Sequence, residues 1–306
     1  MGYRHQWPCI YQATTYGTRL VIIYYLNATN IMTDQLPFRF GSEVYTWFMN
    51  NNGKTHEGRL AHMMEVIARA GFTGVQPIHF WMGDLSDPGL LEANLKLNGI
   101  ELAAISLALD WKGAEETEKE REEADQTIRL LQRFPGAILC TVQKPCGRHD
   151  LVTRRQHLIN IVNSVSRRAM EMGVPCSFHP NSPHSSITRT EEDYQVILPA
   201  LDSAATGWTP DVGHIINAGM DPLEKMKEYS SLINHMHYKD WDGEPEFALM
   251  GQGKVDLLGI TQWLKDRNYK GWIVCEDEGI AAMEDPDFVT LHDGAWVKET
   301  LIKGLK

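Results

Sequence analysis

The stretch TPDVGHIINAG, from Thr209 to Gly219, places Asp211 directly after a strand-like run and His214 three residues further on. An Asp in this position can cap the turn that follows the strand. It can equally be half of a metal site, because carboxylate and imidazole groups both bind divalent ions. The pattern of the rest of the chain decides between these two interpretations.

The chain repeats this strand-then-helix unit. From residue 38 onward, short β-branched or apolar runs alternate with longer amphipathic runs. The expected strands are 38–46, 72–78, 100–107, 136–143, 174–179, 206–213, 233–240 and 271–277. The expected helices are 56–71, about 87–98, 114–134, about 153–172, 190–203, 222–230, 258–268 and a segment after Pro286.

Eight such repeats, with no second zone of composition, predict an α/β fold that consists of a single (β/α)₈ TIM barrel. A doubly wound open sheet is the structural alternative, and it usually carries a glycine-rich phosphate loop after its first strand. Here the first expected strand ends in YTWFMNNNG, without a G-x-G-x-x-G pattern.

The N-terminal residues differ from this pattern. Residues 1–31 have mixed polarity, and Met32 begins the more conventional start MTDQLPFRFGSEVYTW. We therefore expect residues 1–31 to be an extension outside the fold and residues 32–306 to form the barrel domain.

The charge and hydropathy of the chain limit the kinds of binding partner that can be expected. The chain of 306 residues carries 29 Lys and Arg against 40 Asp and Glu, a formal net charge of −11. That balance repels a phosphate backbone on average, so nucleic acid is not an expected partner. No apolar run reaches the length of a membrane span, and we expect no membrane association. A small-molecule substrate is the expected partner.

The five cysteines are odd in number, irregularly spaced and free of any C-x-x-C pattern: Cys9, Cys140, Cys146, Cys176 and Cys275. Such usage is typical of a reducing compartment, without disulfides or structural zinc. The expected location is the cytoplasm.

The last four expected strands each end in a group that can bind a metal. These groups are His179, Asp211, His237 and Glu276. Active sites of such barrels lie at the carboxyl ends of the strands, so the four side chains can converge there. Taken alone, Asp211 could be a cap, Glu276 could pair with a lysine, and either histidine could be structural, but four at successive strand ends favour a metal site.

A ligand set of nitrogen and oxygen without thiolate suits one divalent ion. Mn²⁺ is the expected ion, and Co²⁺, Mg²⁺, Fe²⁺ or Zn²⁺ fit the same set. Open positions on the ion could take water and two substrate oxygens, so that the metal polarises a carbonyl and stabilises an enediolate.

Residues 38–304 resemble the xylose isomerase-like barrel superfamily, which includes sugar isomerases, epimerases and inosose dehydratases. The resemblance lies in Asp211-x-x-His214 with INAGMDP, then HMHYKD around His237, GQGKVD (251–256) and YKGWIVCEDE. It implies a metal held by the four strand-end residues, substrate contact by His214, and proton transfer by Glu276. Lys239 is a further candidate for substrate binding, and Glu278 is a weaker candidate beside the metal ligands. Gly251, Gly253 and Asp256 are expected to have a structural role in the loop that leads to the last helix.

One position departs from the epimerases of this superfamily. Ketohexose epimerases usually carry a Glu at the end of strand five, facing a second Glu across the substrate, and here the residue is His179 in SFHPNSPHSS. A His can serve as ligand or base, and we count His179 among the catalytic candidates. Inosose dehydratases resemble the sequence more closely here. His184 is then either a substrate contact or a solvent-exposed loop residue.

The sequence therefore predicts a divalent-metal-dependent sugar isomerase or epimerase acting on a keto-sugar or cyclitol. The first alternative is a dehydratase or lyase of the inosose dehydratase type. A remoter alternative is an abasic-site endonuclease, which shares the barrel but needs three zinc ions and further ligands. The resemblance also implies a homo-oligomer, dimer or tetramer.

Aromatic residues near the strand ends could stack on sugar C–H faces. Trp47 and Trp111 are the expected substrate contacts, with Phe48 and Trp81 nearby in the same regions. Packing at the barrel mouth is the alternative role for all four.

Overall fold

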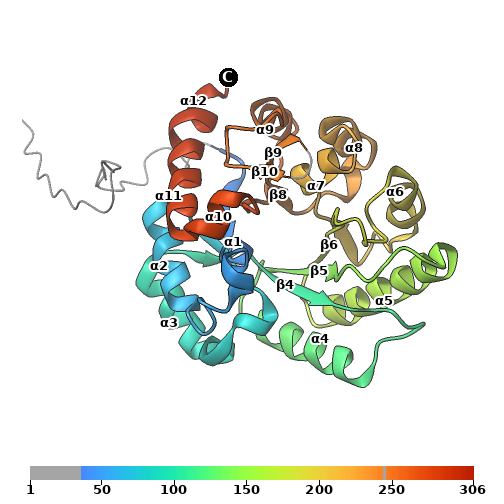
Figure 1. Cartoon of the computed structure of the whole chain (residues 1–306). Coiled ribbons are helices and arrows are strands. Elements are labelled where there is room, and N and C mark those ends of the chain that lie inside the picture. The colour runs from blue at the N-terminus through green and yellow to red at the C-terminus, as the bar shows by residue number, and fades with distance from the viewer. Residues whose placement is uncertain (1–35, 244–245) are drawn as a thin grey trace, which may run out of the picture.

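The structure is a computed structural model that describes residues 36–243 and 246–306. Within these ranges, parallel strands alternate with helices, and the strands form a barrel that the helices surround (Figure 1). The predicted α/β class and single (β/α)₈ barrel are confirmed. The expected extension at residues 1–31 lies outside the described residues.

Eight barrel positions are filled within the described ranges. The strands are β1 (Arg39–Glu43), β2 (Gly74–Gln76), the broken strand β3 (Glu101–Leu102) with β4 (Ala104–Leu109), β5 (Ile138–Gln143), β6 (Cys176–Phe178), β7 (Thr206–Trp208), β8 (Met236–Tyr238) and β11 (Trp272–Cys275). They pair in the orders β3-β2-β1-β11-β8 and β4-β5-β6-β7. Isolated parallel bridges Ile78–Ser106 and Trp208–Ile233 join the two sheets and close the barrel.

The main helices follow the strands in the predicted order. They are α2 (Leu60–Ala70), α3 (Pro88–Asn98), α4 (Glu118–Leu131), α5 (Leu151–Glu171), α6 (Glu191–Ile197), α8 (Pro222–Glu228), α9 (Leu257–Asp266) and α11 (Pro286–Trp296). Their ends carry the expected signals. Gly71 ends α2 in the left-handed region with φ 93°, and Asp256 caps α9 by accepting the Gly259 N–H at 2.9 Å.

Several short elements were not predicted. They are α1 (Tyr45–Phe48), α7 (Val212–Asn217), α10 (Ile280–Glu284), α12 (Ile302–Gly304), the antiparallel pair β9 (Asp240–Gly243) and β10 (Glu246–Ala248), the 3₁₀ turns at Asn50–Gly53, His79–Trp81, Gly83–Ser86, Leu198–Ala200 and Ser230–Leu232, and a π turn at Val297–Leu301.

Two expected strands are shorter than predicted for the same reason. β1 ends at Glu43 because α1 begins at Tyr45, and β7 ends at Trp208 because Asp211 begins α7. In both cases an apolar run continues from the strand into the helix, so hydrophobicity alone does not mark the boundary. The correction places Glu43 at a strand end rather than inside a strand.

The segment after β8 is tied to the barrel by Asp240. Its carboxylate accepts backbone N–H groups from Trp241 (2.9 Å), Gly251 (2.9 Å), Gly253 (2.8 Å) and Val255 (3.2 Å). A Cβ on Gly253 would lie 2.1 Å from the Asp240 carboxylate, so only glycine fits there. The predicted structural role of Gly251 and Gly253 follows from these contacts.

Candidate metal centre and cavity

The four strand-end residues of the predicted ligand set come together. One ligand atom from each of His179, Asp211, His237 and Glu276 lies within 4.8 Å of the others, and all four side chains are buried. The pairing of neighbouring strands aligns their ends, with His237 bridging to Asp211 and Val274 of β11 opposite His237 of β8. The register of the barrel therefore builds this cluster.

Asp211 performs both of the roles that the sequence left open. Its Oδ1 accepts the His214 N–H at 2.8 Å and caps α7. Its Oδ2 has no hydrogen bond and lies 3.5 Å from His179 Nε2. Burial alone would raise the pKa of this carboxyl, but His214, Lys239 and His179 outweigh burial and hold its pKa well below the usual range.

A chain of hydrogen bonds orients His237. Gln76 Oε1 lies 2.7 Å from His235 Nε2 and 3.1 Å from His237 Nε2, while Gln76 Nε2 donates to Ser106 Oγ at 2.8 Å. The Ser106 hydroxyl in turn donates to Glu43. Because a carboxylate oxygen can only accept from Ser106, every donor in the chain is fixed in direction. His237 therefore carries its proton on Nε2 and presents the Nδ1 lone pair to the cluster.

Lys239 provides a buried positive charge beside the cluster. Its Nζ lies 3.2 Å from Asp211 Oδ2 and 3.4 Å from Glu276 Oε1, and it also contacts Glu278 and His214. Burial would lower the pKa of the ammonium, but Asp211, Glu276 and Glu278 hold it well above its usual value. Gly213 makes room for the Lys239 side chain, since a Cβ at residue 213 would lie 2.6 Å from Lys239 Cβ.

Two other titratable side chains complete the wall around Lys239. Burial lowers the pKa of His214 to about 4, with Lys239 and His179 adding to the effect, so His214 is neutral at pH 7. Burial also raises the pKa of Glu278. The Phe247 ring covers both His214, at 5.5 Å between ring centroids, and Lys239, whose Nζ is 5.0 Å from the ring centroid.

The donor set fits a divalent ion. Both ring nitrogens of His179 and Oδ2 of Asp211 are buried without a hydrogen bond. Each unsatisfied buried polar atom costs about 1–3 kcal/mol, and a cation bound by these atoms would remove that cost. Two imidazoles and two carboxylates match borderline ions such as Mn²⁺, Co²⁺, Fe²⁺ and Zn²⁺.

A cavity of about 230 Å³ opens onto the cluster. Besides His179, His237 and Glu276, its walls include His214 and Glu278, which the sequence singled out. The remaining lining residues are Glu43, Tyr45, Phe48, Ile78, Phe80, Ser106, Ala108, Val142, Lys144, Pro145, Asn181 and Pro183. The volume suits a compact ligand of monosaccharide size.

Four expected substrate contacts are not among these lining residues: Trp47, Trp111, His184 and Lys239. Trp47 and Trp111 are fully buried, and the Trp47 indole donates to Asp287 at 2.7 Å. Phe48, Tyr45 and Phe80 supply the aromatic surface instead. His184 is exposed and lies 2.9 Å from an Arg189 guanidinium nitrogen. Trp47, Trp111 and His184 therefore lie outside the cavity wall, whereas Lys239 contacts Asp211 and Glu276 without lining the cavity.

Glu43 is the main component that sequence reasoning missed. Its carboxylate is 4% exposed and its Oε2 lies 3.2 Å from His237 Nδ1. Burial and the neighbouring Glu276 raise the pKa of Glu43 well above its usual value. The available signal was a carboxylate two residues before the aromatic run of the first strand-helix junction. Gln76, Ser106, Lys144 and Asn181 were also missed.

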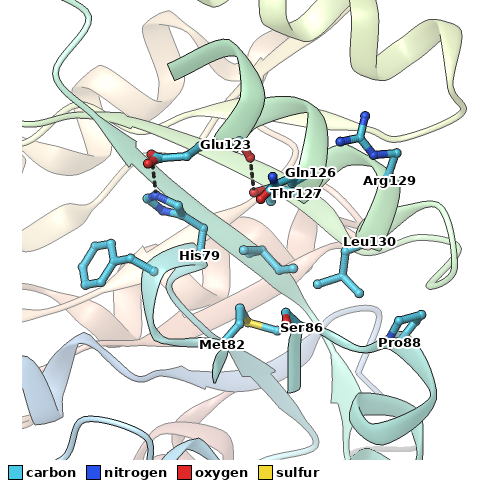
Figure 2. Close-up of a pocket in the computed structure, with 11 residues that line it drawn as sticks. His79, Met82, Ser86, Pro88, Glu123, Gln126, Thr127, Arg129 and Leu130 are labelled. Carbon is cyan, nitrogen blue, oxygen red and sulfur yellow. Dashed lines mark hydrogen bonds and ion pairs between the residues drawn. The ribbon is translucent and has the colours of Figure 1, made fainter. Parts of the chain in front are cut away.

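A second, more open pocket of about 560 Å³ lies on the outer side of β4, between α4 and the segment that leads into α3 (Figure 2). His79 Nε2 faces Glu123 Oε2 at 3.4 Å there, and the Thr127 hydroxyl donates to the Glu123 backbone oxygen at 2.8 Å. These polar groups satisfy one another. The pocket therefore differs from the strand-end cavity, where both ring nitrogens of His179 lack a hydrogen bond.

The closed barrel and its strand-end cluster define a class of (β/α)₈ proteins that hold their chemistry at the carboxyl ends of the strands. The chain belongs to the xylose isomerase-like TIM barrel family, whose sequence profile matches residues 64–300.

Proteins similar to this chain include a dehydratase and an epimerase. The inosose dehydratase of Clostridium botulinum is 22% identical over 273 residues, which cover 79% of this chain and 90% of the relative. The IOLI protein, solved with a bound zinc atom, aligns with a TM-score of 0.71 and 13% identity over 88% of this chain and all of its own. D-psicose 3-epimerase from Clostridium cellulolyticum aligns with a TM-score of 0.66 and 14% identity, covering 86% and 98% of the two chains.

Within residues 36–243 and 246–306, every helix is too short or too polar to cross a bilayer.

Proposed function

We propose that this protein is a metal-dependent dehydratase, a carbon–oxygen lyase that removes water from a cyclic polyhydroxy ketone of the inosose type. One divalent ion, with Mn²⁺ as the first candidate, is its cofactor. This choice replaces the isomerase or epimerase that the sequence favoured with the alternative that it left open.

One observation carries the proposal. Every carboxylate that lines the cavity, Glu43, Glu276 and Glu278, comes from the ends of β1 and β11, which are neighbouring strands. The wall formed by β4, β5, β6 and the residues that follow them carries no carboxylate, and offers Ser106, Ala108, Val142, Lys144, Pro145, His179, Asn181 and Pro183. An epimerisation by two carboxylates needs them on opposite faces of the substrate. An arrangement on one side favours removal of a proton and a hydroxyl from the same face.

The relatives support the same choice. The curated relatives at 21–23% identity are named inosose dehydratases. Epimerisation remains the second candidate, because D-psicose 3-epimerase shares the fold and because His179 stands where a second proton carrier would be needed.

The bound ion would be held by His179, Asp211, His237 and Glu276, and it would polarise the substrate carbonyl as a Lewis acid. Glu276 is placed to accept the proton from the carbon next to that carbonyl. The Lys239 ammonium beside the cluster adds positive charge that stabilises the negative charge developing on oxygen, and neutral His214 accepts a Lys239 N–H at Nε2. Phe48 and Phe80 form the apolar wall that excludes water.

The test is an assay of the purified, Mn²⁺-loaded protein with inososes and with ketohexoses. We expect an inosose to lose one water, detected as a mass decrease of the product. Recovery of an epimer or aldose–ketose isomer without loss of water would contradict the dehydratase and support the second candidate.

A further inference from the structure

Asn181 lies across the barrel from the carboxylates that line the cavity. It follows β6, which β2, the broken strand β3–β4 and β5 separate from β1 on one side, and β7, β8 and β11 on the other. Asn181 is 8% exposed and forms part of the cavity wall. A ligand in the cavity therefore meets Glu43 and Glu276 on one side and Asn181 on the other.

Hydrogen bonds fix the direction in which the Asn181 amide points. Its Nδ2 donates to the Gln143 carbonyl oxygen at 2.8 Å, and because a carbonyl oxygen can only accept, the amide nitrogen must lie on that side. The backbone N–H of Asn181 donates to Thr188 Oγ1 at 3.1 Å, and the Thr188 hydroxyl donates to the backbone oxygen of Asn181 at 3.4 Å. Only Oδ1 is left: it is buried, and no residue that the structure describes donates a hydrogen bond to it.

The chemistry of this oxygen determines what can satisfy it. An amide oxygen has two lone pairs and no hydrogen, so it can bind only an O–H or N–H donor. A buried acceptor without a donor destabilises the protein. The cavity that Asn181 lines is the space from which a donor can approach Oδ1.

We propose that Asn181 is a specificity-determining residue, whose Oδ1 accepts a hydrogen bond from a substrate hydroxyl on the ring edge away from Glu43 and Glu276. This assignment rests on the proposed dehydratase function and narrows its substrate to a cyclic ketone with a free hydroxyl at that edge. A carbonyl, an ether oxygen or a carboxylate at the same place offers no donor, so a ring that carries one there is rejected.

A second asparagine provides a matched control. Asn234 precedes β8, its Nδ2 donates to the Cys176 carbonyl oxygen at 2.8 Å, and its Oδ1 is likewise buried without a donor among the described residues. It lines a separate pocket at the amino-terminal ends of β6 and β7. Asn234→Ala therefore removes a similarly bonded amide without touching the strand-end cavity.

The experiment measures how wild type, Asn181→Ala and Asn234→Ala, all Mn²⁺-loaded, bind an inositol and a set of monodeoxy-inositols that each lack one hydroxyl. These cyclitols have no carbonyl, so calorimetry reports a Kd without turnover. In the wild type, the analogue that lacks the hydroxyl bound by Asn181 should bind about 10–100-fold more weakly than the parent, because it leaves Oδ1 buried without a donor.

The variants should differ in this discrimination. Asn181→Ala should bind the parent about 10–100-fold more weakly, should no longer distinguish it from that one analogue, and should still distinguish the others. Asn234→Ala should keep the wild-type ranking. Metal content should be equal in all three proteins. Asn181→Leu, which also lacks the amide but is closer to it in volume, gives the same comparison if Asn181→Ala does not fold.

Three results would overturn the assignment. An unchanged ranking of the analogues in the Asn181 variants would show that a water molecule, and not the ligand, satisfies Oδ1. Equal weakening for the parent and every analogue, without loss of discrimination, would show that Asn181 only supports the cavity wall. A wild type that binds none of these cyclitols would exclude the expected hydroxyl contact.

The proposed function is tested separately. A wild type that discriminates among the cyclitols through Asn181 but dehydrates no inosose would sink the dehydratase and leave the hydroxyl contact in place.

Discussion

Asp193 and Asp211 are both fully buried carboxylates at the start of a helix, but their surroundings differ. Asp193 receives Arg155 Nε at 2.7 Å, Arg148 Nη1 at 2.7 Å and the Thr190 N–H at 2.7 Å, so both of its oxygens are satisfied. Asp211 has one satisfied oxygen and one without a hydrogen bond. Complete hydrogen bonding of both oxygens is typical of a structural carboxylate, whereas Asp211 Oδ2 faces the Lys239 ammonium at 3.2 Å and His179 Nε2 at 3.5 Å without a hydrogen bond, and so can bind a ligand.

The largest expected effect comes from removing the charge of Asp211. Asp211→Asn keeps an oxygen that can cap α7 but removes the charge that a cation needs. We expect bound metal to fall from about one ion per chain to a small fraction, and activity to fall by more than about 100-fold. Elemental analysis and circular dichroism measure the two halves separately. Full metal content in this variant would show that Asp211 is not a ligand.

Asp193→Asn should have the opposite effect: it should lower the stability of the fold and leave metal binding unchanged. It leaves the buried guanidinium of Arg155, 3% exposed at its side chain, with only the exposed Glu192 as a charged partner. Removing one member of a buried ion pair costs about 3–5 kcal/mol. Urea unfolding should show that loss in the free energy of unfolding, while metal content stays at the wild-type level. A loss of metal without a loss of stability would break the comparison.

Metal itself should stabilise one variant and not the other. A metal concentration 100-fold above Kd adds about 2.7 kcal/mol to the stability of a protein that binds it only when folded. Thermal melts with Mn²⁺ and with a chelator should differ for the wild type and for Asp193→Asn. The Asp211→Asn melt should not respond. An equal response in all three proteins would place the metal elsewhere.

The smallest effect concerns pH. Burial would raise the pKa of Asp193, but Arg148, Thr190 and Arg155 outweigh it and hold its pKa below the usual value. Its charged form therefore stabilises the fold above the unfolded pKa of about 3.9, and this contribution is lost as pH falls through the lower folded pKa. The stability gap between the wild type and Asp193→Asn should shrink as urea titrations move from pH 7 toward pH 3. A constant gap would contradict the assigned cause.

The ligand cluster was predictable because it depends on strand order alone. Once the alternation of strands and helices predicted a barrel, the ends of the last four strands had to meet at one edge, and His179, Asp211, His237 and Glu276 were the polar residues there. Which of the flanking groups would reach the cluster depended on exact strand ends.

The positions of Glu43 and of the aromatic residues that line the cavity could not be predicted from strand order alone. The run FRFGSEVYT predicts a strand to residue 46, which places Glu43 in its interior, but the chain turns into α1 at Tyr45. Helical residues advance about 100° each, so Trp47 packs inward while Phe48 faces the cavity. A shift of the strand boundary by a few residues therefore changed which aromatic ring lines the cavity.

The anchoring of the β9–β10 segment has a consequence for how ligands enter and leave. Asp240 holds this segment by four backbone N–H groups, and Phe247 on it rests on His214 and Lys239. A Cβ on Gly279 would lie 2.6 Å from the Phe247 carbonyl oxygen, which leaves little room beneath the segment. This side of the cavity mouth is thus held in place, whereas the Phe80 side chain, which also lines the cavity, is 45% exposed beside Lys144. In the proposed enzyme, substrate entry and product release would then depend on the Phe80 side chain rather than on movement of the β9–β10 segment.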